Sequence, residues 1–88
     1  MTKMYVCHQV ANFENWKAVF DSMHDLRARY GCTRERVFRG QENPNEVLIV
    51  TEWPTKNEAL GYGQSPDLKE GMKKAGVASV PEINFSEN

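Results

Sequence analysis

The chain has 88 residues, of which 26% are charged and 40% hydrophobic, and its formal net charge at pH 7 is −1. This length indicates one domain over residues 1–88, and so small a charge creates no field that would attract nucleic acid or anionic lipid. No apolar run approaches the roughly 20 residues of a membrane span, and the start "MTK" leads into a strand pattern rather than a signal peptide. We therefore expect a cytoplasmic protein without a nucleic-acid or membrane partner.

The first element, Met4–Val10 ("MYVCHQV"), alternates its side chains as a strand does. One face carries Met4, Val6 and Val10, with His8 in their midst. Because this face is the more aliphatic one, we expect it to lie against the helices, which would place the imidazole of His8 inside the protein.

Residues 13–30 carry apolar side chains at spacings of three and four, which predicts one amphipathic helix. Asn12 is suited to cap its start and Gly31 to end it. On a helical wheel Arg27 falls inside the apolar arc, where its charge must be matched or hydrated. His24 lies at the flank of that arc.

Two strands are predicted in the middle of the chain. Residues 32–40 ("CTRERVFRG") are heavily charged, which favours an edge strand. After the turn "QENPNE", residues 47–53 ("VLIVTEW") begin with a continuous apolar run, which predicts a strand that is covered on both faces.

A second helical region follows Pro54, and Thr55 and Glu58 have the spacing of a capping box. We expect an interruption at Gly61 and Gly63, since glycine is a poor helix former. The helix then restarts with three matching signals, which are a cap at Ser65, a proline at position 66 and a glycine stop at position 76. Residues 81–87 ("PEINFSE") predict a short closing strand.

The order strand, helix, strand, strand, helix, strand predicts an α+β, ferredoxin-like split βαββαβ fold. Its sheet would be four-stranded and antiparallel, with the first and third strands in the centre and two helices on one face. The central strands are nearly free of charge on both faces, and an uncovered face would expose a large apolar patch. We therefore expect a symmetric homodimer that forms through the open face of the sheet.

Three segments, "HQVANFENWKAVFDSMHDLRARYG", "VFRGQENPNEVLIVTEW" and "SPDLKEGMKKAGVASVPEI", resemble small bacterial proteins of the dimeric α/β-barrel superfamily. Proteins of this type are commonly described as antibiotic biosynthesis monooxygenase-like or polyketide cyclase-like, and the resemblance extends from about Met4 to Phe85. It implies a ferredoxin-like protomer, a dimer with the sheets face to face, and a pocket for flat, largely apolar molecules. Members include cofactor-free oxygenases, cyclases and haem-degrading enzymes, so fold-level analogy leaves the reaction open.

His8 is the first candidate for chemistry, because an imidazole has an ordinary pKa near ~6.5 and suits a general base or a donor. Arg27 could meet a carboxylate, an enolate or a phenolate, and His24 is a third candidate. The candidate substrate-binding residues are aromatic: Trp53, Trp16, Tyr62, Tyr30 and Tyr5. Each residue also has a structural interpretation: a hydrogen-bonded buried imidazole for His8, an arginine whose head reaches solvent for Arg27, a surface position for His24 and core packing for the aromatic residues.

Several chemistries lack a motif. The sequence has no phosphate-binding loop, no GxGxxG or GxSxG element and no CxxC pair. We expect no cofactor and no metal, although a metal-assisted site at His8 and His24 is a third, weaker hypothesis. The haem-degrading branch of the superfamily uses a histidine on the second helix, and this chain has none after His24.

The leading hypothesis is a cofactor-independent monooxygenase or cyclase that acts on a small hydrophobic, polyketide-like or phenolic compound. His8 would accept a proton in a pocket between sheet and helices, and Arg27 or a tyrosine would stabilise the anion. The alternative is a non-catalytic homodimer that binds a small ligand or regulates a partner.

Overall fold

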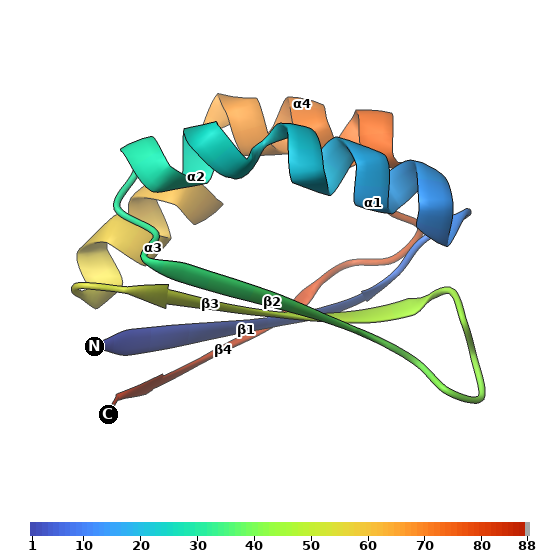
Figure 1. Ribbon diagram of the computed structural model, residues 1–88, viewed down its shortest axis with the longest axis horizontal. Helices are drawn as coiled ribbons and strands as arrows, with labels where there is room; N and C mark the ends of the chain where they lie inside the picture. The colour runs from blue at the N-terminus through green and yellow to red at the C-terminus, as the bar shows by residue number, and fades with distance from the viewer. Residues whose placement is uncertain (88) are drawn as a thin grey trace.

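The computed structural model describes residues 1–87. Within these residues the chain forms four strands and four helices (Figure 1). In chain order they are β1 (Thr2–Gln9), α1 (Phe13–Ser22), α2 (His24–Arg29), β2 (Arg34–Arg39), β3 (Glu46–Trp53), α3 (Lys56–Gly63), α4 (Pro66–Ala75) and β4 (Glu82–Glu87).

The strands form one antiparallel sheet in the order β2-β3-β1-β4, which confirms that the first and third strands are central. The four helices lie on the same side of this sheet, and no helix of residues 1–87 lies over its other face (Figure 1). The protein is therefore a two-layer α+β, ferredoxin-like domain, as the order of elements predicts. No helix within residues 1–87 is long and apolar enough to cross a bilayer.

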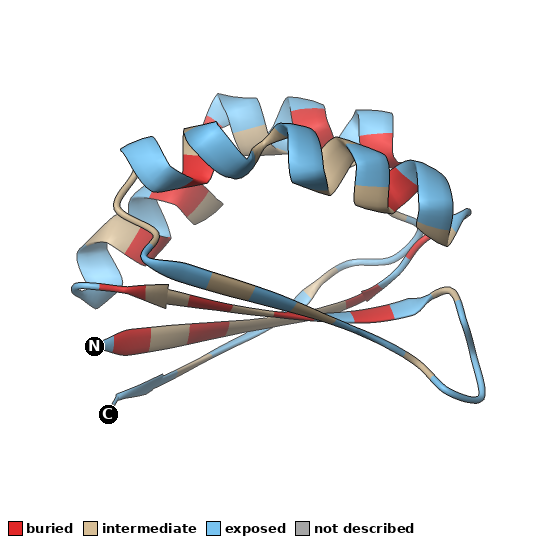
Figure 2. Ribbon diagram, viewed as in Figure 1, coloured by how far each residue is buried: buried red, intermediate tan, exposed pale blue. Residues whose placement is uncertain are grey.

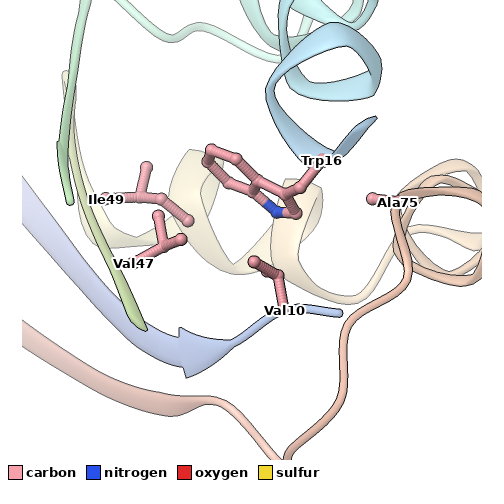
Figure 3. Packing of buried hydrophobic residues seen from close by; sticks show 5 residues of the cluster. All are labelled: Val10, Trp16, Val47, Ile49 and Ala75. Atoms are coloured by element: carbon pink, nitrogen blue, oxygen red, sulfur yellow. The ribbon is translucent and has the colours of Figure 1, made fainter. Parts of the chain in front are cut away.

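The core lies between the two layers, along the central strands and the inward sides of the helices (Figure 2). In Figure 3 the indole of Trp16 extends from α1 toward Val47 and Ile49 on β3, with Val10 and Ala75 beside it. Val47 and Ile49 alternate with outward-facing neighbours along β3, because successive side chains of a strand point to opposite faces. Val47 is fully buried, whereas the neighbouring Leu48 is 36% exposed.

Local signals in the sequence explain where most helices begin and end. Asn12 Oδ1 accepts the backbone N–H of Asn15 at 2.9 Å at the start of α1. Thr55 and Glu58 form the predicted capping box before α3, and Ser65 caps α4. Gly76 ends α4 with a φ of 70°, a left-handed conformation that glycine adopts without strain.

The prediction of one helix over residues 13–30 is wrong, because the helix breaks at Met23 between α1 and α2. The carbonyl of Phe20 accepts the backbone N–H of Met23 at 3.1 Å and Arg27 Nη2 at 2.8 Å. A buried arginine side chain thus bonds to the backbone where α1 ends. The spacing of apolar residues cannot show such a bond, because both segments keep the same inward face.

Candidate functional site

A cavity of about 350 Å³ lies between the sheet and the helices. Its floor consists of side chains from the two central strands: Met4, Val6 and His8 of β1, and Ile49 and Thr51 of β3. Its roof comes from helices α1, α2, α3 and α4, with Trp16, Phe20, Arg27, Tyr62 and Leu68 among the contributors. Lys69 and Ile83, both exposed, also line it. Most of this wall is apolar, so the few polar groups in it decide what chemistry the cavity supports.

His8 is a polar residue in the floor of this cavity, and it is only 6% exposed. Strand alternation and the pairing of His8 with Val47 bring it to the helix-facing side of the sheet. Neither ring nitrogen has a hydrogen-bond partner among residues 1–87. Leaving a buried polar group unpaired costs roughly 1–3 kcal/mol. Burial also lowers the pKa of His8 below its usual value, which keeps the imidazole neutral at pH 7.

Three side chains extend the wall away from His8. The indole of Trp16 meets the imidazole edge-on, with 5.9 Å between ring centroids and 80° between planes. Phe20 stacks on Trp16 at 5.1 Å, and the guanidinium carbon of Arg27 lies 3.7 Å from the centroid of the Phe20 ring. His8 and Arg27, which are far apart in sequence, therefore belong to one continuous wall.

Arg27 is almost fully buried, with 1% of its surface exposed. Its charge is matched by Glu35 on β2, since Nε donates to Glu35 Oε2 at 2.5 Å. Burial alone would lower the pKa of Arg27, but Glu35 and Tyr62 outweigh it, so the pKa stays above its usual value and the charge persists. The arginine does not reach solvent, which contradicts the structural interpretation drawn from its place on the helical wheel.

His24 lies on the outer side of the same ion pair. Its Nδ1 is 2.8 Å from Glu35 Oε1, and its side chain is 65% exposed. It does not line the cavity, so the structure does not bring His24 to the same site as His8. Burial alone would raise the pKa of Glu35, but the bonds from Arg27 and His24 outweigh this effect and lower it.

Tyr62 reaches the cavity from α3 and is 5% exposed. Burial raises the pKa of its phenol, and the neighbouring Arg27 offsets only part of that increase. The phenol therefore keeps its proton at neutral pH and is a hydrogen-bond donor. Tyr62 also packs edge-on against Tyr30 and beside Trp53.

The other predicted aromatic residues lie outside the cavity wall. Trp53 is fully buried, and its Nε1 donates to Thr51 Oγ1 at 2.8 Å. The ring of Tyr30 meets that of Tyr62 edge-on, with 5.7 Å between the ring centroids. Tyr5 points to the opposite face of the sheet, where its hydroxyl lies 3.0 Å from Ser86 Oγ. The sequence pattern alone does not distinguish these supporting roles from contact with a ligand.

Within the described part of the chain, no group of three or more histidine, cysteine or acidic side chains is placed to hold a metal ion. Cys7 and Cys32 are both free.

Sequence reasoning did not name several wall residues as candidate site residues: Phe20, Ile49, Thr51, Leu68 and Gly63. Strand alternation could have predicted two of these residues. Ile49 and Thr51 lie opposite Val6 and Met4 in the sheet, so alternation along both strands places them beside His8 on the same face.

The family model described as antibiotic biosynthesis monooxygenase matches residues 8–74, well over half of the chain. The chain belongs to the antibiotic biosynthesis monooxygenase family. The match begins at His8 and includes α1, α2, α3 and all but the last residue of α4, so the residues of the cavity wall fall largely inside the family domain. The comparison with curated proteins finds no match.

Solved structures with the same fold include proteins that are named for this family. A protein from Bordetella bronchiseptica, named for this family, superposes with a TM-score of 0.85 and 20% identity, over 99% of this chain and 95% of that one. A protein from Nitrosomonas europaea, also named for this family, superposes with a TM-score of 0.78 and 14% identity, over 100% of this chain and 98% of that one. SnoaB, a cofactor-independent oxygenase from Streptomyces nogalater, superposes with a TM-score of 0.77 and 14% identity, over 99% of this chain and 93% of that one. These similarities show a common fold.

Proposed function

We propose that this member of the family is a cofactor-independent monooxygenase or cyclase that acts on a small hydrophobic phenolic or polyketide-like compound in the cavity beside His8. The observation that carries the proposal is the imidazole of His8, which is buried in a cavity wall and has no partner among residues 1–87 for either nitrogen. A neutral imidazole offers one lone pair and one N–H. A bound hydroxyl or acidic C–H would pair with it.

The proposed chemistry starts with proton transfer to His8. Its lowered pKa keeps the ring in the neutral form that accepts a proton. The substrate then becomes a phenolate or carbanion, from which addition of oxygen and intramolecular aldol closure can both proceed. Family membership and the fold that the chain shares with the oxygenase SnoaB favour oxygenation.

In this proposal Arg27 and Tyr62 stabilise the resulting anion. Nε and one Nη of Arg27 bond to Glu35 and to the carbonyl of Phe20, but a guanidinium carries five N–H donors and Arg27 also lines the cavity. The protonated phenol of Tyr62 supplies another donor. Donors that are held in place before the reaction stabilise developing charge without reorganising.

The experiment is oxygen uptake and product analysis with a panel of hydroxynaphthalenes and β-diketones, on wild type, His8→Leu and His24→Asn. We expect turnover with at least one compound, a loss of at least about 100-fold in kcat for His8→Leu, and little change for His24→Asn. Full turnover by His8→Leu would disprove the mechanism. Binding of the same compounds without turnover would support the alternative of a ligand-binding or regulatory protein.

We also propose a homodimer that forms through the face of the sheet without helices. By strand alternation and register, the centre of this face consists of Tyr5, Cys7, Phe38, Leu48 and Val50. Phe38 and Leu48 are 43% and 36% exposed. An apolar centre on an open sheet favours burial against a second copy.

A further inference from the structure

Gly63 is the last residue of α3, and it lines the cavity. A Cβ atom built on Gly63 meets nothing within 4 Å, so the position faces open space. Its φ is not positive, since Gly31 and Gly76 are the glycines with positive φ in residues 1–87. Neither the backbone nor packing against a neighbour therefore requires glycine at position 63.

The other glycine of the cavity wall, Gly71 on α4, has a different explanation. A Cβ there would collide with the end of the Met23 side chain, so a larger residue would push Met23 aside where α1 and α2 join. Close packing of helices accounts for Gly71. At Gly63 neither explanation applies, and the effect of the missing side chain is to leave open space in the cavity wall.

The size of the cavity indicates what that space can hold. A dry apolar cavity of roughly 150 Å³ in a protein binds one benzene ring. The cavity here is about 350 Å³, a little more than twice that volume. It therefore matches two fused rings.

We propose that Gly63 is a specificity-determining residue, which leaves room for a two-ring aromatic compound with one hydroxyl group. One hydroxyl matches the imidazole of His8, whose two nitrogens are the buried side-chain atoms that lack a partner among the described residues. A larger side chain at position 63 would restrict the cavity to a single ring. This inference rests on the proposed function, because it assumes that the ligand enters the cavity beside His8.

The test is titration calorimetry with phenol and 2-naphthol on wild type, Gly63→Ala, Gly63→Leu and Gly61→Leu. Gly61 is the matched control, because it lies in the same helix, does not line the cavity and would place a Cβ 4.0 Å from Tyr30. We expect wild type and Gly61→Leu to bind 2-naphthol more tightly than phenol. Gly63→Leu should weaken the affinity for 2-naphthol at least about tenfold and the affinity for phenol less than about threefold. Gly63→Ala should weaken the affinity for 2-naphthol by a smaller factor.

The outcomes separate this inference from the proposed function. If wild type binds neither compound, the proposed function fails and the inference fails with it. If wild type binds 2-naphthol and Gly63→Leu binds it equally well, or loses both compounds alike, only the inference is overturned. Thermal unfolding of each variant verifies folding, and Gly63→Ala carries the test if Gly63→Leu does not fold.

Discussion

At the scale of single residues, His8 costs stability where it stands. Its imidazole is buried without a hydrogen-bond partner in the described part of the chain, and burial lowers its pKa. The unfolded chain binds a proton at the ordinary pKa near ~6.5, whereas the folded chain binds one only at lower pH. The free energy of unfolding is therefore unaffected by the titration of His8 above about pH 6.5, and it decreases as the pH falls from there toward the lower pKa of the folded state.

We predict that His8→Leu stabilises the fold by about 1 kcal/mol at pH 7, because it removes two unpaired polar groups from an apolar wall. The gain should increase as pH is lowered from about 7 toward 5, where only wild type pays for protonation. Urea unfolding of both proteins at several pH values measures this difference. A loss of stability in His8→Leu at every pH would show that the imidazole has a structural partner.

Arg27 and Glu35 give the opposite prediction. Removing Glu35 leaves the charge of the buried Arg27 uncompensated, so Glu35→Ala should cost about 3 kcal/mol. Asp21→Ala is the control, because Asp21 pairs with Lys17 on the exposed side of α1, and such pairs contribute about 0.5 kcal/mol. Equal costs for the two variants in urea unfolding would contradict the account of Arg27.

The sequence locates His8 and Arg27 as ionisable groups on apolar faces, and alternation along β1 predicts the face on which His8 lies. It does not predict the partner of Arg27. Glu35 comes from an edge strand whose charges indicate solubility, and only the pairing of β2 with β3 brings it under α2. Side chains that meet through tertiary packing leave no local pattern.

At the scale of elements, capping and turn chemistry predict most boundaries to within two residues. Asn12, Thr55, Ser65 and Gly76 each act as their residue types indicate. The break at Met23 escapes prediction, because no proline or glycine marks it. The bond found there, from Arg27 to the carbonyl of Phe20, joins residues seven positions apart and leaves no local pattern.

Helix α3 offers a test of helix propensity alone. Gly61 is exposed in its interior, and a Cβ there would make only ordinary contact with Tyr30. We predict that Gly61→Ala raises the free energy of unfolding by about 0.5–1 kcal/mol, since alanine restricts the unfolded chain and favours helix. Thermal unfolding measures the effect, and a lowered Tm would mean that α3 must bend at this residue.

At the scale of the whole molecule, the two-layer arrangement leaves one face of the sheet with no helix of residues 1–87 over it (Figure 1). The prediction that β3 is covered on both faces depends on a second copy, which is the proposed homodimer. The residues of β3 that face away from the helices include Leu48, which is 36% exposed.

We predict that the protein sediments as a dimer at micromolar concentration, and that Leu48→Asp converts it to a monomer because a carboxylate would be buried unpaired. Leu60→Asp is the matched control, since Leu60 is also 36% exposed but lies on α3. Sedimentation of wild type as a monomer, or dimers in both variants, would exclude this interface.

The central claim is that the cavity holds a neutral imidazole that is available to a ligand. The most direct measurement is an NMR titration of His8 in the His24→Asn protein, which leaves one histidine in the chain, with and without 2-naphthol. We expect a midpoint below about 6.5 and a shifted imidazole signal when the ligand is added. A midpoint at or above 6.5, with a signal that the ligand does not change, would contradict the account.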